Sequence, residues 1–159
     1  MDLIVKGYET GKMSKHIVNL QPGDSLEIKG PLIKFVYVAN MKKEIGMIAG
    51  GSGITPMMQV VKEILLNPKD DTTVHLLFAN ATMEDIILRD EIDALVALYP
   101  SQFKVSYCLS QQVGDAAWKG YTGRITKEMV ELTMPKPSDA NMVRHTCYPH
   151  PLPSLSRHV

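Results

Sequence analysis

The pattern of apolar and polar positions changes near residue 44. Before that point, short runs of strand-forming residues are separated by turn signals such as Pro22-Gly23 and Gly30-Pro31. We expect a short helix over 14–20 and strands over 3–6, 25–29 and 35–38. Short strands at this spacing indicate a piece of a barrel or of a small sheet, and three of them are too few to close a barrel alone.

After residue 44, buried strands alternate with amphipathic helices. The run 45–49 is continuously apolar, which is typical of a strand buried on both faces. Apolar spacing also predicts strands over 73–79 and 103–109, and helices over 56–67, 84–99 and 126–132, the last with Thr126 as its N-cap. This alternation predicts an α/β fold with a doubly wound parallel sheet and right-handed crossovers.

Residues 141–159 depart from this pattern. They include prolines at 149, 151 and 153, and they contain no Asp or Glu. A strand here would lie beside the strand at 45–49, where Arg144 and His145 would be buried without evident partners. We therefore expect 141–159 to be irregular chain outside the core, which would leave one edge of the first strand unpaired.

Composition narrows the class of protein. The 159 residues suit one ordinary domain or two small lobes, and a hydrophobic content of 45% is that of a soluble globular protein. Seventeen Lys and Arg balance seventeen Asp and Glu, so the general electrostatic argument for binding nucleic acid or anionic membrane is absent. No apolar run approaches the ~18–20 residues that span a bilayer, and two cysteines, Cys108 and Cys147, cannot form a disulfide framework. We expect a soluble, intracellular chain.

The most informative segment is Gly50-Gly51-Ser52-Gly53-Ile54-Thr55-Pro56, which joins a predicted strand to a predicted helix. Glycines let the backbone approach a ligand closely, and their N–H groups can point at a phosphate. We expect Thr55 to be the N-cap and Pro56 the first helical residue. A tight structural turn is the alternative, but the strand–turn–helix context favours binding of a phosphate or a dinucleotide. The segment matches neither the Gly-x-Gly-x-x-Gly fingerprint nor a P-loop.

A second candidate phosphate site is Gly11-Lys12-Met13-Ser14, which combines a flexible turn, a cation, a hydroxyl and a helix start. Standing alone, this segment is better explained as an ordinary capped helix. No metal site is predicted, since His145-x-Cys147-x-x-His150 lacks the paired ligand spacing of zinc sites. Cys108 alternates with strand residues and is predicted to be a small buried hydrophobe.

Together these motifs resemble the NADH–cytochrome b5 reductase family of ferredoxin-reductase-like flavoproteins. The resemblance is carried by Gly-Lys-Met-Ser, by Pro-Gly-Asp-Ser-Leu-Glu-Ile-Lys-Gly-Pro, by Met-Ile-Ala-Gly-Gly-Ser-Gly-Ile-Thr-Pro-Met and by Leu-Leu-Phe-Ala-Asn-Ala-Thr. It covers about residues 2–139, and residues 30–43 look closest to the mitochondrial-type members. Two substitutions stand out, because Ser52 replaces the Thr of most members and Ser110 replaces the usual Asp.

The resemblance implies a partial antiparallel β-barrel that binds FAD, over 1–43, and an NADH-binding α/β domain over 44–140, followed by an irregular non-family tail over 141–159. It places Lys6 at the junction of flavin and nicotinamide, and it implies that Lys6 and Thr55 are the catalytic residues. The cofactor-binding residues that it implies are Gly11, Lys12, Met13 and Ser14 for the FAD pyrophosphate, Gly50, Gly51, Ser52, Gly53 and Thr55 at the flavin–NADH contact, and Phe78, Ala79, Asn80, Asp85 and Ser110 along the dinucleotide.

The function implied is that of an FAD-dependent oxidoreductase that passes electrons from NADH to a haem protein such as cytochrome b5. The family's location implies a mitochondrial or endoplasmic reticulum membrane. Because the family's upstream barrel strands and its closing Cys-Gly-Pro-Pro motif have no counterpart here, we expect a form truncated at both ends. A non-catalytic nucleotide-binding remnant or splice variant of such a reductase is the alternative.

Overall fold

The computed structural model describes residues 3–30, 36–111 and 118–146, and for residues 143–146 it describes the backbone alone. The chain divides into two compact units, Met1–Tyr37 and Val38–Val159. We call them the N-terminal unit and the C-terminal unit.

The described part of the N-terminal unit contains one short helix, α1 (Lys12–Val18), and no strand. The helix overlaps the expected range of 14–20, but it begins and ends two residues earlier. The strands expected over 3–6, 25–29 and 36–38 do not form, and residue 35 lies outside the described residues. A strand is stable only when a neighbour pairs with its N–H and C=O groups. Apolar side chains of these segments accordingly stay exposed, including Leu3, Ile28 and Val36.

The C-terminal unit is built on a five-stranded sheet in the order β4-β3-β2-β1-β5, with every described pairing parallel. The strands are β1 (Glu44–Gly50), β2 (Thr73–Asn80), β3 (Phe103–Leu109), β4 (Tyr121–Thr122) and β5 (Asn141–Thr146). The helices are α2 (Ile54–Leu65), α3 (Arg89–Leu98) and α4 (Lys127–Thr133), and a 3₁₀ turn, η1 (Gly51–Gly53), precedes α2. This arrangement confirms the predicted α/β class with its parallel sheet.

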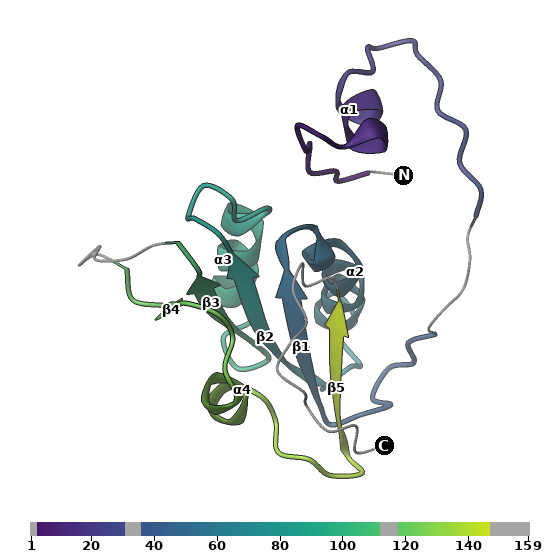
Figure 1. Cartoon of the computed structure of the whole chain (residues 1–159). Coiled ribbons are helices and arrows are strands. Elements are labelled where there is room, and N and C mark those ends of the chain that lie inside the picture. The colour runs from purple at the N-terminus through teal and green to yellow at the C-terminus, as the bar shows by residue number, and fades with distance from the viewer. Residues whose placement is uncertain (1–2, 31–35, 112–117, 147–159) are drawn as a thin grey trace. The chain divides into compact units, whose positions relative to one another are not determined.

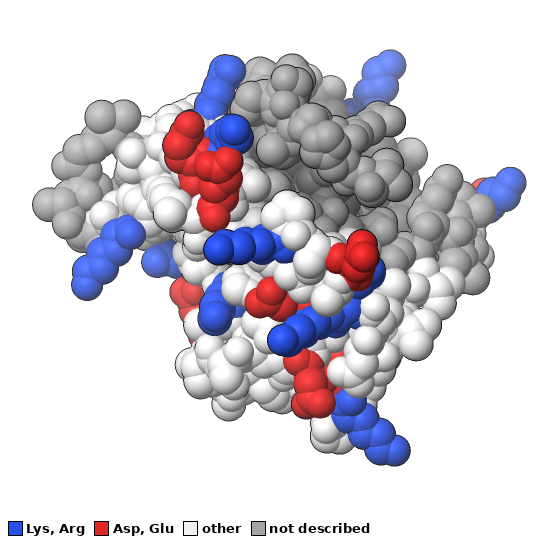
Figure 2. Space-filling view, turned by 90° about the horizontal axis from the view of Figure 1, so that it is seen from below, with Lys and Arg blue, Asp and Glu red and all other residues white. Residues whose placement is uncertain are grey.

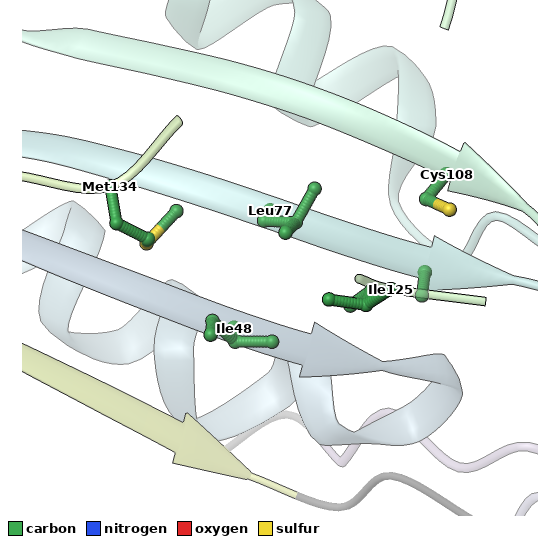
Figure 3. Close-up of a cluster of buried hydrophobic side chains, with 6 residues drawn as sticks. Ile48, Leu77, Cys108, Ile125 and Met134 are labelled. Carbon is green, nitrogen blue, oxygen red and sulfur yellow. The ribbon is translucent and has the colours of Figure 1, made fainter. Parts of the chain in front are cut away.

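Helices cover both faces of the sheet: α2 and α3 lie on one side and α4 on the other (Figure 1). Strand alternation explains this division. On the α4 side, Ile48 and Leu77 are paired across β1 and β2, and they pack with Cys108, Ile125 and Met134 in a buried cluster (Figure 3). On the other side, Phe78 and Tyr107 are paired across β2 and β3, where the Tyr107 hydroxyl bonds to α3. Cys108 is completely buried, as predicted.

The loops at the amino edge of the sheet are joined by a polar network around Asp70. This carboxylate is 4% exposed, and its Oδ1 accepts hydrogen bonds from the N–H groups of Asn40 (3.2 Å) and Thr72 (3.1 Å). The Asn40 amide donates to the Lys69 carbonyl (2.7 Å) and accepts from the Asp71 N–H (2.9 Å). Asn40 has a φ of 58°, a left-handed conformation that Asn tolerates better than most residues. Figure 2, which looks onto this side of the molecule, shows acidic and basic side chains interspersed.

The expectation that residues 141–159 are irregular is wrong for their first part. Residues 141–146 form β5, which runs parallel to β1 with Glu44 opposite Asn141 and Ala49 opposite Thr146. The edge of β1 that was expected to be unpaired is therefore occupied. The prediction failed because β5 is an edge strand of the described sheet, and edge strands commonly carry charged residues. Residues 147–159 lie outside the described residues.

Two helix starts also differ from expectation. We predicted α3 from residue 84, but it begins at Arg89 because Leu88, with a φ of 61°, adopts the left-handed conformation and interrupts the winding. The residues before it form a turn in which the Asp85 carboxylate accepts hydrogen bonds from the N–H and the hydroxyl of Thr82, both over 3.2 Å. Such side-chain bonds offer the backbone an alternative to a helix. The helix α2 begins earlier than predicted, at Ile54.

Candidate functional site

The predicted dinucleotide residues of the C-terminal unit meet at the carboxyl edge of the sheet. Parallel strands end at the same edge, and β1, β2 and β3 end there at Gly50, Asn80 and Leu109. Gly50 is paired with Ala79, and Asn80 with Leu109. Open parallel sheets bind their ligands outside these carboxyl ends. The fold thus brings together residues that the sequence separates: Gly50, Gly51, Ser52, Gly53, Thr55, Phe78, Ala79, Asn80 and Ser110.

The turn after β1 needs glycine at its first position. Gly51 has a φ of 50°, a left-handed conformation that L-residues with a side chain rarely adopt. A Cβ added at Gly51 would meet nothing within 4 Å, so the backbone here borders open space. From this turn the chain winds through η1 directly into α2, which places the start of a long helix at the carboxyl edge.

The start of α2 lacks a side-chain cap. Its N-cap is Gly53, and Thr55, which we expected to be the cap, lies in the first helical turn and donates from its hydroxyl to the Ser52 carbonyl over 3.2 Å. Pro56 is consequently the third helical residue and not the first. The correction has a physical cause, since η1 already starts the winding before Thr55. No side-chain cap hydrogen bond is made at this helix start, although the Ile54 N–H donates to the Gly51 carbonyl within η1 and Pro56 has no N–H. The positive end of the helix dipole still favours an anion here.

Asn80 supplies polar atoms that lack partners. Its side chain is 7% exposed, and neither Nδ2 nor Oδ1 has a hydrogen-bond partner in the structure. Phe78, two residues earlier, is fully buried and packs its ring against Tyr107 at a centroid distance of 6.3 Å. Buried amides are nearly always paired, so the unpaired one fits a site that a polar ligand completes.

The remaining dinucleotide residues flank this edge. Ser110 is exposed immediately after β3, and its N–H donates to the Asn80 carbonyl over 3.0 Å. Asp85 lies in the turn between β2 and α3, where its carboxylate holds Thr82. The uncapped helix start, the open glycine turn and the unpaired amide together fit a dinucleotide.

The predicted FAD segment forms a closed turn in the N-terminal unit. The Gly11 N–H donates to the Tyr8 carbonyl (3.0 Å), and the Ser14 hydroxyl accepts from the Tyr8 N–H (3.2 Å). A Cβ on Gly11 would overlap Ser14 Oγ and lie 3.2 Å from Tyr8 Cβ, so the turn requires glycine. Lys12 and Met13 are exposed at the start of α1. An exposed cation beside first-turn N–H groups fits a phosphate.

The two residues predicted to be catalytic belong to different units. Lys6 is half-buried in the N-terminal unit, whereas Thr55 lies in α2 of the C-terminal unit. Their catalytic roles therefore stay a prediction.

One group near the site was not predicted from the sequence. The Tyr107 ring lies between those of Phe78 and Trp118, at centroid distances of 6.3 and 6.4 Å. The Trp118 indole N–H donates to the Tyr121 carbonyl over 3.0 Å, which fixes its ring. The alternation of residues within β3 shows that Tyr107 and Cys108 lie on opposite faces of the sheet. Only the register with β2 shows that Phe78 is the neighbour of Tyr107.

Comparison with known families agrees with this geometry. The oxidoreductase NAD-binding domain family matches residues 47–152, and the oxidoreductase FAD-binding domain family matches residues 1–37. The chain therefore belongs to the oxidoreductases with this NAD-binding domain, and FAD and NAD are the cofactors of the two matching families. The NAD-binding match extends past residue 140, where the family resemblance was expected to end.

Within this class the chain is similar to NADH–cytochrome b5 reductases, which confirms the resemblance carried by its motifs. It is 46% identical to an NADH-cytochrome b5 reductase-like protein of Arabidopsis thaliana over 99% of this chain and 46% of the relative. It is 50% identical to NADH-cytochrome b5 reductase 1 of Dictyostelium discoideum over 89% of this chain and 49% of the relative. The chain thus spans about half the length of these relatives.

Solved structures show the same fold. The cytochrome b5 reductase domain of Ulva prolifera nitrate reductase superposes with a TM-score of 0.81 at 36% identity, over 86% of this chain and 55% of that one. The CS-b5R domains of human Ncb5or, solved in an NAD+ form, superpose with a TM-score of 0.67 at 26% identity, over 89% of this chain and 40% of that one. Among the described residues, no helix is long and apolar enough to cross a membrane.

Proposed function

We propose that this chain binds NADH and serves as the NADH-binding part of an FAD-dependent reductase whose electron acceptor is a haem protein such as cytochrome b5. The observation that carries this proposal is the carboxyl edge of the parallel sheet, where an uncapped start of α2 lies beside the open turn at Gly51. The relatives that match nearly the whole chain are named for the same reaction.

Different residues of the C-terminal unit would bind different parts of the dinucleotide. The start of α2 would face the pyrophosphate, because the positive end of a helix dipole attracts an anion. Thr55 and Gly53, at the same helix start, would line the contact with flavin, while Ser110 and Asp85 would border the part of the dinucleotide that crosses β2 and β3. When bound, the cofactors supply the chemistry itself, a hydride passing from nicotinamide to flavin and electrons leaving singly to haem.

The N-terminal unit would contribute to FAD binding through its closed turn. Gly11, Lys12, Met13 and Ser14 would hold the flavin pyrophosphate, and Lys6 would lie near the flavin ring. The proposed domain division is an FAD-binding part over 1–43 and an NAD-binding part over 44–140. From the family resemblance of its motifs, we propose a location at a mitochondrial or endoplasmic reticulum membrane.

Isothermal titration of the purified chain with NAD⁺ tests the core of this proposal. The wild type should bind NAD⁺, and Gly51→Asn should bind it at least tenfold more weakly, because a side chain would enter the open space beside the turn. Asn is chosen since it tolerates the left-handed conformation, so that the fold itself is spared. Gly23→Asn, at a left-handed position in the N-terminal unit, is the matched control. Equal binding by wild type and Gly51→Asn would contradict the assignment of the site.

A second measurement separates the reductase from a non-catalytic remnant. The chain mixed with FAD and NADH should reduce ferricyanide, with an initial rate that depends on both cofactors. NAD⁺ binding without such a rate would favour a nucleotide-binding remnant, which is the alternative that the sequence left open.

A further inference from the structure

The buried side chain of Asn80 is the one feature of the carboxyl edge that the fold itself does not explain. At 7% exposure the amide is removed from solvent, and both its donor, Nδ2, and its acceptor, Oδ1, lack a partner. Leaving such a group unsatisfied destabilises a protein, whereas an apolar side chain of similar shape carries no such cost. A buried amide without partners in a native fold needs an explanation, and one explanation is a ligand that pairs with it.

The surroundings of Asn80 indicate that the missing partner is a ligand. It lies one residue beyond Ala79, which is paired with Gly50, so its neighbour across β1 is the glycine turn and not another strand residue. The end of β2 is in contact with η1. Its own backbone is fixed, because its carbonyl accepts the Ser110 N–H over 3.0 Å. The backbone of Asn80 is therefore fixed beside the turn that opens the candidate site.

We propose that Asn80 is a specificity-determining residue of the dinucleotide site. Its amide recognises a ligand group that both donates and accepts a hydrogen bond. The unpaired amide lowers the stability of the ligand-free fold. This inference rests on the proposed function. NADH offers two groups of this chemistry, the carboxamide of nicotinamide and the adjacent hydroxyls of a ribose. A buried amide with a purely structural role would have its hydrogen-bond partners within the protein. Its removal would lower stability and would leave ligand affinity unchanged.

The experiment compares Asn80→Leu with the wild-type full chain. Thermal unfolding is followed by the fluorescence of Trp118, which is the chain's single Trp and lies in the C-terminal unit. Without ligand, Asn80→Leu should raise Tm by about 2–4 °C, because the unpaired amide is gone. In isothermal titration, the same variant should bind NAD⁺ about tenfold more weakly, the loss expected when a ligand's hydrogen bonds are left unmade.

Two matched variants keep the result interpretable. Asn80→Asp preserves the shape but removes the donor and adds a buried charge, so it should bind NAD⁺ more weakly and also lower Tm. Asn40→Gly removes an amide whose donor and acceptor are both paired, while glycine keeps the left-handed backbone. It should lower Tm and leave NAD⁺ affinity unchanged, which is the opposite pattern from Asn80→Leu.

Half-ligands identify the recognised group. If Asn80→Leu weakens nicotinamide mononucleotide but not AMP, the contact lies on the nicotinamide half, and the reverse result places it on the adenosine half. A Tm that falls in Asn80→Leu, or NAD⁺ affinity equal to that of the wild type, would overturn the inference while leaving the proposed function intact. A wild type that binds no NAD⁺ would overturn both.

Discussion

The hydroxyl of Tyr107 donates a hydrogen bond to Oδ1 of Asp93 over 2.7 Å, and this bond ties β3 to α3. Burial and the neighbouring carboxylate both raise the pKa of Tyr107 well above its ordinary value, so the phenol stays protonated. Nε of Arg89 lies 3.7 Å from the other oxygen of Asp93, in an i,i+4 ion pair on α3. The contact therefore orients the ring that lies between Phe78, beneath the candidate site, and Trp118.

Removing this hydroxyl tests the contribution of the contact. Tyr107→Phe keeps the ring and loses only the hydrogen bond, so the free energy of unfolding should fall by about 1 kcal/mol. Urea unfolding followed by circular dichroism measures the change. Tyr8→Phe, at an exposed position in the N-terminal unit, is the control and should leave the transition in place. An unchanged midpoint in Tyr107→Phe would mean that water replaces the bond without loss.

Gly120 should not tolerate a side chain. A Cβ at this position would lie 2.7 Å from Cε2 of Trp118 and 2.7 Å from the backbone oxygen of Tyr107, and the latter cannot move without disturbing β3. We expect Gly120→Ala to lower the free energy of unfolding by about 1–3 kcal/mol, as overpacking typically does. The control is Lys119→Ala at the exposed neighbouring position. Similar urea midpoints for the two variants would show that the loop relaxes freely.

His75 should make the fold sensitive to acid. Burial and the charge of Lys104 lower its pKa, and they outweigh the attraction of Glu44, whose Oε1 lies 3.5 Å from Nε2. A pKa lowered by folding means that the unfolded chain binds the proton more readily. The resulting stability is complete above the unfolded pKa of about 6.5 and is lost as the pH falls through the lower folded value.

The measurement for His75 is the free energy of unfolding as a function of pH. Between about pH 7 and pH 5, the wild type should lose stability more steeply than His75→Gln, which carries no titratable group. His16→Gln, on the exposed surface of α1, should follow the wild-type profile. Parallel curves for wild type and His75→Gln would refute the argument.

Much of the C-terminal unit could be predicted because its elements follow local rules. The apolar run that predicted β1 is buried throughout its length after Glu44, and β3 has the predicted bounds. The N-cap of α4 was predicted from Thr126, whose Oγ1 accepts the Met129 N–H over 3.3 Å. Such signals depend on neighbours within a few residues, and the sequence displays these directly.

The larger failures involve partners that are distant in the sequence. β5 was missed because its residues do not resemble a buried strand, and its stability depends on the free edge of β1. The strands expected in the N-terminal unit did not form because each lacks a pairing neighbour among the described residues. At the site, the sequence indicated the glycine turn, but it could not reveal that Asn80 is buried without a partner, since hydrogen-bond satisfaction depends on tertiary packing.

Ser110 provides a test of cofactor preference. An Asp at the end of β3 would repel the additional phosphate of NADPH, whereas Ser110 has no charge and is exposed beside Asn80. We therefore expect the wild type to discriminate weakly between NAD⁺ and NADP⁺. Ser110→Asp should bind NADP⁺ on the order of tenfold more weakly, which is the effect of ~1.4 kcal/mol of repulsion, and should bind NAD⁺ almost unchanged.

Ionic strength separates this electrostatic effect from a steric one. Repulsion between an exposed carboxylate and a phosphate weakens as salt shortens the Debye length, from about 30 Å at 0.01 M to about 10 Å at 0.1 M. The ratio of NADP⁺ to NAD⁺ affinity in Ser110→Asp should therefore rise with added salt, while Ser110→Asn, similar in size but neutral, should keep the wild-type ratio at every ionic strength. Equal ratios for the Asp and Asn variants would show that the charge at position 110 does not reach the phosphate.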